Sequence, residues 1–195
     1  MVAVDAGADA LGFIFVENTP RYVSPDRAAA IVAALPPFVT PVGVFWDHSP
    51  EHVRHVAALC RLDAVQLHGQ EPPEMVAALD LPVLKTLKVA GPADLEPLDR
   101  YKPAAFLLDS PARWSEGEPR APISWTLARE AGRRARVVLS AGLTPESVAA
   151  AIRVARPFGV DVNSGVEATP GRKDPDKLRR FLRAARAATA ELENG

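Results

Sequence analysis

A carboxylate directly follows a short apolar run in the middle of the sequence. Asp109 comes after Phe106, Leu107 and Leu108, a pattern typical of a side chain that emerges at the end of a buried strand. Partial burial there would raise the pKa of this carboxyl group and suit it to general acid catalysis. An aspartate that only caps the following loop fits the same pattern, and the local sequence leaves both interpretations open.

Two glycine-containing segments have the composition of a phosphate site. Ser140-Ala141-Gly142 ends one apolar run, and Asn163-Ser164-Gly165 ends the next. Glycine at such points lets backbone N–H groups approach an anion, and in β/α barrels the last two strand ends are the usual place for a phosphate. We therefore expect phosphate binding by Gly142, Asn163, Ser164 and Gly165, against the alternative that the glycines merely turn the chain.

Two further polar residues follow strand-like segments. Arg21, in Thr19-Pro20-Arg21-Tyr22, could hold a carboxylate or a phosphate with two parallel hydrogen bonds, although surface arginines are commoner. His68 ends Val65-Gln66-Leu67-His68 and either lines a site or hydrogen-bonds a loop. Both are candidates for substrate binding.

Other residues with chemical potential fit ordinary roles better. His48, His52 and His55 have helical spacing, but no cysteine or carboxylate completes a convincing metal set, so a solvated helix face is expected. Cys60 falls on an apolar stripe and should be a buried, inert thiol. Lys85 and Lys88 would need desolvation to form a Schiff base, which we do not expect. The residues thus predict neither a metal site nor a Schiff-base lysine.

Composition excludes several classes of protein. The 195 residues carry a formal net charge of −1, with 23 lysines and arginines against 24 aspartates and glutamates, so neither nucleic acid nor an anionic membrane is an expected partner. No apolar run reaches the length of a membrane span, and no basic segment precedes an early apolar one. A single cysteine cannot form an internal disulfide. We expect one domain over residues 1–195 in a cytoplasmic protein.

Seven apolar runs predict strands, and they are continuous rather than alternating, as in parallel strands that are covered on both faces. The runs are Ala10 to Phe15, Pro41 to Phe45, Ala64 to Leu67, Pro82 to Val89, Ala104 to Leu108, Arg136 to Leu139 and Phe158 to Val162. Their spacing of roughly 25 residues suits a (β/α)8 barrel, although an open doubly wound sheet shows the same alternation. Polar residues near most strand ends favour the barrel, because such ends converge on one face: Asp47, His68, Lys85, Asp109, Ser140, Asp161 and Asn163.

Helix signals lie between these runs. Ser24, Ser49 and Thr144 are each followed by proline and an acidic residue, which predicts a capped helix start at all three. From about Asp174 to the end, apolar residues lie on one side and arginines lie away from it, which predicts an amphipathic outer helix.

The combination of these segments resembles phosphoribosylanthranilate isomerase along essentially the whole chain. The most specific pieces are Gln66-Leu67-His68-Gly69 and Ser164-Gly165-Val166-Glu167 with the later Pro170-Gly171 and Lys173-Asp174. Weaker ones are Gly7 to Phe13, Pro20 to Ser24, Val42 to Phe45, Leu107 to Asp109 and Asp161 to Asn163.

The resemblance implies a (β/α)8 barrel of tryptophan biosynthesis that converts N-(5-phosphoribosyl)anthranilate to 1-(2-carboxyphenylamino)-1-deoxyribulose 5-phosphate, without metal or cofactor. Asp109 is then the general acid, Arg21 holds the anthranilate carboxylate, and Asp161 contacts the ribose. His68 joins them as a substrate-binding residue, and Gly142, Asn163, Ser164 and Gly165 cradle the phosphate. The implied partner is a small phosphorylated substrate, bound by a monomer or a homodimer.

One departure from the family pattern bears on activity. The family begins with a strand of the form Lys-Ile-Cys-Gly-Ile-Thr, whose cysteine is the general base, whereas this chain starts within the first helix at Met1. Seven of eight strands are therefore expected, together with weak catalysis and unpaired sheet edges at the first and last strands. A noncatalytic phosphate-binding remnant or a truncated chain is the alternative function, and another sugar-phosphate barrel enzyme is a third.

Overall fold

The computed structural model describes residues 1–111 and 123–194. Seven strands form one sheet in the order β1-β2-β3-β4-β5-β6-β7, and every neighbouring pair is parallel. The strands are β1 (Ala10–Ile14), β2 (Thr40–Phe45), β3 (Ala64–Leu67), β4 (Val83–Lys88), β5 (Ala105–Asp109), β6 (Val137–Leu139) and β7 (Gly159–Val160). All seven predicted strands are thus present, within two residues of most predicted bounds.

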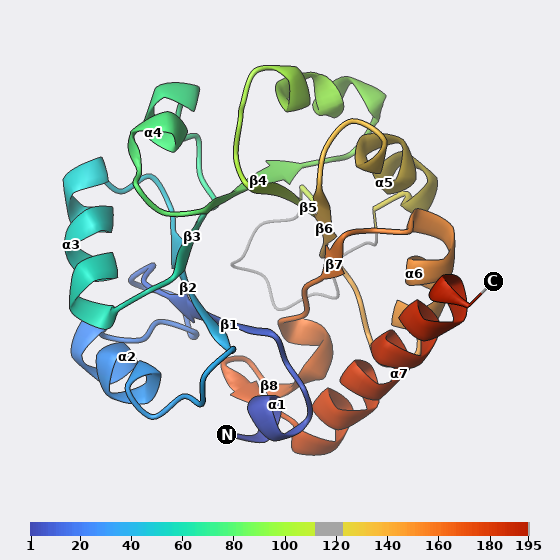
Figure 1. Cartoon of the computed structure of the whole chain (residues 1–195), viewed down its shortest axis with the longest axis horizontal. Helices are drawn as coiled ribbons and strands as arrows, with labels where there is room; N and C mark the ends of the chain where they lie inside the picture. The colour runs from blue at the N-terminus through green and yellow to red at the C-terminus, as the bar shows by residue number, and fades with distance from the viewer. Residues whose placement is uncertain (112–122, 195) are drawn as a thin grey trace.

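The sheet curls around a central axis and the helices lie outside it (Figure 1). The strand order follows the chain without reversal, whereas a doubly wound sheet reverses its order at a switch point. The predicted (β/α)8-type fold is confirmed, with β1 and β7 at the two ends of the strand order. Consequently, the carboxyl ends of β3, β4 and β5 meet on one rim.

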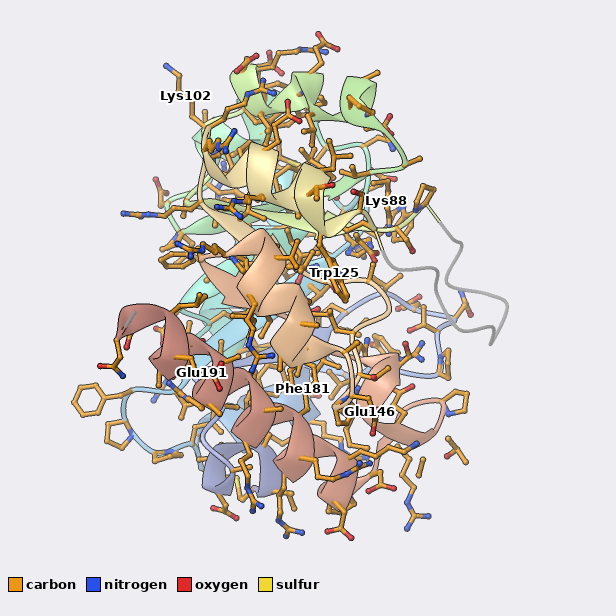
Figure 2. The ribbon with its side chains drawn as sticks, turned by 90° about the vertical axis from the view of Figure 1, so that its right-hand side faces the viewer. Lys88, Lys102, Trp125, Glu146, Phe181 and Glu191 are labelled. Carbon is orange, nitrogen blue, oxygen red and sulfur yellow. The ribbon has the colours of Figure 1, made fainter. Side chains whose placement is uncertain are left out.

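Helices connect the strands and cover the outer face of the sheet. The α-helices are α1 (Val2–Asp5), α2 (Pro25–Val32), α3 (Pro50–Cys60), α4 (Pro73–Ala78), α5 (Trp125–Gly132), α6 (Val148–Ala155) and α7 (Pro175–Glu193). Two 3-10 helices, η1 (Pro92–Asp99) and η2 (Ser164–Val166), and an antiparallel hairpin of β8 (Glu167–Thr169) and β9 (Arg172–Lys173) complete the elements. The amphipathic prediction for α7 is confirmed, because Phe181 is buried on its inner face (Figure 2).

Two of the three predicted helix starts are confirmed. Ser24 and Ser49 are the N-cap residues of α2 and α3, and Ser49 Oγ accepts a hydrogen bond from the His52 N–H at 3.2 Å. The third prediction is wrong, since α6 begins at Val148 after N-cap Ser147. Thr144 instead closes a turn, in which its Oγ1 accepts the N–H groups of Glu146 and Ser147 at 3.2 and 3.3 Å.

The core consists of two clusters of buried apolar side chains. The first takes residues from Phe13 to Val83 and packs β1, β2 and β3 against α2, α3 and α4. The second takes residues from Leu87 to Ala188 and packs the later strands against α5, α6 and α7. Tyr101 packs against both clusters. Within the described ranges, no helix combines the length and the apolarity that crossing a membrane requires.

Candidate functional site

Asp109, the predicted general acid, is the last residue of β5 and is only 1% exposed. Its Oδ1 accepts the Ser110 N–H at 2.9 Å. Its Oδ2 accepts a hydrogen bond from Lys88 Nζ and lies 3.4 Å from His68 Nε2. The structure therefore brings two predicted site residues, Asp109 and His68, to one point, together with a lysine that the sequence did not suggest as their partner.

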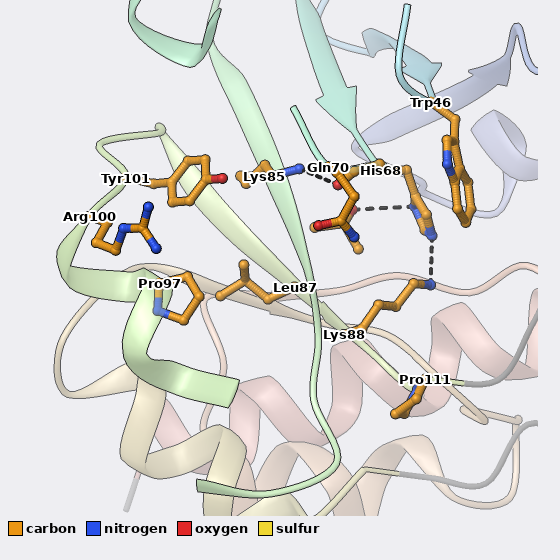
Figure 3. Close-up of a pocket in the computed structure, with 12 residues that line it drawn as sticks. Trp46, His68, Gln70, Lys85, Leu87, Lys88, Pro97, Arg100, Tyr101 and Pro111 are labelled. Carbon is orange, nitrogen blue, oxygen red and sulfur yellow. Dashed lines mark hydrogen bonds between the residues drawn. The ribbon is translucent and has the colours of Figure 1, made fainter. Parts of the chain in front are cut away.

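The register of the parallel sheet explains why Lys88 lies there. Lys88 ends β4 directly opposite Asp109 in β5. Its Nζ is also 2.8 Å from His68 Nε2, as Figure 3 shows. No sequence signal marked this pairing, because it depends on the register, in which Leu84 pairs with Ala105 and Lys88 with Asp109. The prediction that Lys85 ends this strand is wrong, because Lys85 lies in the middle of β4.

The imidazole of His68 is held from its other side. Its Nδ1 lies 3.0 Å from Gln66 Nε2 and 3.3 Å from Thr86 Oγ1. The ring of Trp46 packs against it with centroids 5.1 Å apart. Because three neighbours fix the ring plane, Nε2 keeps its direction toward Asp109 Oδ2.

A cavity of about 380 Å³ opens beside this group, between the ends of β2, β3 and β4 and the segment that follows η1 (Figure 3). Trp46, His68 and Lys88 line one end, and Arg100 and Tyr101 line the other. The lining is aromatic and basic, which suits an anionic ligand with an aromatic part.

A buried ion pair supports the loop that carries His68. Lys85 Nζ donates to Glu71 Oε2 at 2.6 Å and to the Gly69 carbonyl oxygen at 2.7 Å, and both charged side chains are at most 3% exposed. Glu71 Oε1 accepts the backbone N–H groups of Asp47 and Gly69 at 2.9 and 3.0 Å. Burial acts to raise the pKa of Glu71, but the bonds from Lys85 and from the Asp47 N–H outweigh it and hold the pKa below its ordinary value. Sequence reasoning did not identify Glu71, since nothing local marks its distant partner.

Arg21 follows β1 and is engaged by a carboxylate. Its Nε donates to Glu167 Oε1 at 2.9 Å and its Nη2 donates to Glu167 Oε2 at 2.7 Å. Lys173 Nζ donates to the same Oε1 at 3.1 Å and to the Asn163 carbonyl oxygen at 2.8 Å. Hydrogen bonds therefore connect Arg21, the candidate carboxylate ligand, with the loop that contains the candidate phosphate residues.

The candidate phosphate residues lie in two adjacent loops. Gly142 follows β6 with a φ of 67°, and Asn163, Ser164 and Gly165 follow β7. Ser164 and Gly165 begin η2, the 3-10 helix that directly follows Asn163. Asp161 lies beside these loops, where its Oδ2 accepts the Ser140 hydroxyl at 3.0 Å. Backbone donors at the ends of neighbouring strands are the arrangement that phosphate sites in barrels use.

Gly165 has a steric requirement that can be tested. A Cβ at this position would lie 1.8 Å from the Leu143 carbonyl oxygen, so the loop after β7 would have to move away from the loop after β6. We expect Gly165→Ala to raise KM for a phosphorylated substrate about tenfold, because such overpacking displaces the N–H donors. Steady-state kinetics check this.

Gly132→Ala is the matched control, since nothing lies within 4 Å of a Cβ at position 132. Its KM should equal that of the wild type. An unchanged KM for Gly165→Ala would contradict phosphate binding between these loops.

The remaining chemical candidates do not join the site. Cys60 is buried, as predicted; its Sγ donates to the Pro25 carbonyl oxygen at 3.3 Å, and burial raises the pKa of the thiol. The rings of His48 and His52 stack with centroids 4.8 Å apart, and both meet the ring of Phe45 edge-on. Within residues 1–111 and 123–194, no three histidine, cysteine, aspartate or glutamate side chains form a group that could hold a metal ion.

A curled parallel sheet with a buried carboxylate, an imidazole and an ammonium at its carboxyl rim defines a protein of the β/α-barrel class with candidate acid–base groups at the rim. A profile of the family N-(5'phosphoribosyl)anthranilate (PRA) isomerase matches residues 1–184. The chain therefore belongs to the N-(5'-phosphoribosyl)anthranilate isomerase family.

Individual relatives agree with this assignment. The chain is 45% identical over 191 residues to N-(5'-phosphoribosyl)anthranilate isomerase of Pelobacter propionicus, covering 98% of this chain and 91% of the relative. A solved structure described as monomers of dimeric phosphoribosylanthranilate isomerase from Thermotoga maritima is 40% identical, with a TM-score of 0.84, and the match covers 95% of this chain and 91% of that one. A phosphoribosyl anthranilate isomerase solved with reduced 1-(o-carboxyphenylamino)-1-deoxyribulose 5-phosphate is 42% identical, with the same TM-score and coverage.

Proposed function

We propose that this chain isomerises N-(5'-phosphoribosyl)anthranilate to 1-(2-carboxyphenylamino)-1-deoxyribulose 5-phosphate in tryptophan biosynthesis. Family membership carries the reaction, and the single structural observation that supports it most is the buried Asp109 beside His68 and Lys88. The reaction needs a proton on the furanose ring oxygen, so that the ring opens to a Schiff base, and then a base that takes the proton from C2, which gives an enolamine that becomes the ketone.

Asp109 is the proposed acid for ring opening. Its carboxyl group ends a strand at the rim, and His68 and Lys88 contact the same oxygen, Oδ2, which fixes its direction. A carboxyl group that is held in one direction reaches the ring oxygen without first being oriented, once it carries the proton that it must give up. His68 and Asp161 are the proposed contacts to the ribose portion.

The substrate carries an anion at each end, and the proposed binding residues form two groups, one for each anion. Gly142, Asn163, Ser164 and Gly165 would bind the phosphate through their backbone N–H groups. Arg21 would bind the anthranilate carboxylate through a bidentate contact. A ligand held at both ends leaves its ribose between them, where an acid must act.

The test is the fluorescence of phosphoribosylanthranilate, generated in place and followed after addition of the protein. We expect an enzyme-dependent decay, and we expect N-ribosylanthranilate, which lacks the phosphate, to react with a kcat/KM at least tenfold lower because one anchoring contact is lost. A decay rate independent of protein concentration would refute the proposed function and favour a noncatalytic phosphate-binding protein.

The setting and assembly are also proposals. A substrate with a carboxylate and a phosphate cannot cross a bilayer unaided, which supports action in the cytoplasm, where such intermediates are retained. A monomer or a homodimer is proposed, and one of the solved relatives is described as dimeric.

A further inference from the structure

Arg21 uses only one edge of its guanidinium group in this structure. The Nε and Nη2 atoms donate to the two oxygens of Glu167, and the side chains of both residues are mostly buried, 15% and 6% exposed. In the described ranges, Nη1 has no hydrogen-bond partner. A guanidinium group has five N–H donors, so a second carboxylate can bind the edge formed by Nη1 and the remaining Nη2 hydrogen.

Glu167 is fixed independently of Arg21. Its Oε1 also accepts Lys173 Nζ at 3.1 Å and the Gly171 N–H at 3.3 Å, and its backbone carbonyl oxygen accepts Lys177 Nζ at 3.0 Å. The hairpin that carries it lies directly against the Arg21 loop, since a Cβ on Gly171 would be 2.2 Å from the Pro20 carbonyl oxygen. A carboxylate that Lys173 and the Gly171 N–H hold without Arg21 can orient the guanidinium group that it binds.

The charges of this cluster leave an excess that suits an anion. Arg21 and Lys173 share one carboxylate, Glu167, so these three groups together carry one net positive charge, and Asp161 is a further negative charge that acts on Lys173. Burial acts to raise the pKa of Glu167, but the hydrogen bond from Arg21 and the charge of Lys173 hold the pKa below its ordinary value. The Glu167 carboxylate is therefore ionised at neutral pH. Because it pairs with both Arg21 and Lys173, its one negative charge does not cancel both positive charges.

We propose that Glu167 is a positioning residue, which holds Arg21 by its Nε–Nη2 edge so that the opposite edge receives the carboxylate of the substrate. This inference rests on the proposed function, because it assigns Arg21 to the anthranilate carboxylate. The competing arrangement, in which Glu167 occupies the edge that the substrate needs, predicts the opposite effect of removing the Glu167 charge.

The experiment measures the affinity of two ligands by calorimetry. One is reduced 1-(o-carboxyphenylamino)-1-deoxyribulose 5-phosphate, and the other is the same molecule without the carboxyl group. We expect Glu167→Gln to weaken binding of the carboxylated ligand about tenfold or more, because Arg21 loses its orientation, and to leave the carboxyl-free ligand unchanged. In an Arg21→Ala background, the same substitution should have no further effect on either ligand.

A matched control is Glu191→Gln. Glu191 is an exposed residue of α7 whose carboxylate pairs with Arg153 of α6 (Figure 2). The substitution should change neither affinity. Thermal unfolding monitors folding of each variant, and Glu167→Asp, which keeps the charge but shortens its reach, should show the same selective loss if Glu167→Gln does not fold.

Three results would overturn the inference: tighter binding of the carboxylated ligand by Glu167→Gln, equal weakening of both ligands, or no preference of the wild type for the carboxylated one. Turnover of phosphoribosylanthranilate by the same wild-type preparation separates these from a failure of the proposed function. If the wild type turns the substrate over and any of the three results is found, the proposed function stands and the role of Glu167 is refuted.

Discussion

Replacement of Asp109 by asparagine is expected to lower kcat of the isomerase reaction about 10²- to 10⁴-fold, the usual contribution of a positioned general acid. An amide is nearly the same size as the carboxyl group but cannot give up a proton to the ring oxygen. The buried position of Asp109 makes replacement by solvent water inefficient, since the side chain is only 1% exposed. The decay of substrate fluorescence, with wild type and variant at equal concentration, measures the effect.

Asp99→Asn is the control for this experiment. The substitution makes the same change from a carboxylate to an amide, but at an exposed residue of η1 that pairs with Arg134. Its kcat should match that of the wild type. If Asp109→Asn, shown by circular dichroism to be folded, kept the wild-type kcat, then Asp109 would not be the acid and the site assignment would be wrong.

The buried pair of Glu71 and Lys85 should dominate the effect of point substitutions on stability. We expect Lys85→Met to lower the free energy of unfolding by about 3–5 kcal/mol, because it leaves a buried carboxylate without its cation. Urea unfolding measures the change. The double variant with Glu71→Gln should recover part of the loss, since removing both charges also removes the cost of desolvating them.

Lys102→Met, at an exposed lysine (Figure 2), is the matched control and should leave the free energy of unfolding unchanged.

The dependence of stability on pH gives a second measurement of the pair of Glu71 and Lys85. The pKa of Glu71 in the folded protein lies below the ordinary 4.5, so its ionised form stabilises the fold above that pH and the contribution is lost as pH falls through the folded pKa. The stability difference between wild type and Glu71→Gln should shrink correspondingly below pH 4.5. A difference that stayed constant would show that the Glu71 charge does not stabilise the fold.

The strands were predictable because most of them are mainly apolar runs, and polar residues at the strand ends predicted that Asp109 and His68 would share a rim. The partners of these residues were not predictable in the same way. Lys88 contacts Asp109 only because the register of β4 and β5 places them side by side, and a shift by one residue would turn Lys88 away. The pair of Glu71 and Lys85 connects the loop after β3 with β4, so no local pattern contains both residues. Lys85 also lies inside a strand, where apolarity alone predicts an apolar side chain. The predicted helix start at Thr144 was wrong because a hydroxyl that caps a turn has the same local sequence as one that caps a helix.

The division of the core has a consequence for how the chain folds. The buried side chains of the cluster around β1, β2 and β3 all precede Leu84, and those of the second cluster all come from Leu87 onward. Among the partly buried residues packed against them, Val2, Ala3 and Tyr101 depart from this division. A ribosome delivers the N-terminal residues first, so the first cluster can close before the second has been synthesised. Tyr101, which packs against both, arrives after the first cluster is complete and before most of the second. The order of synthesis is therefore also the order in which this protein can bury its apolar surface.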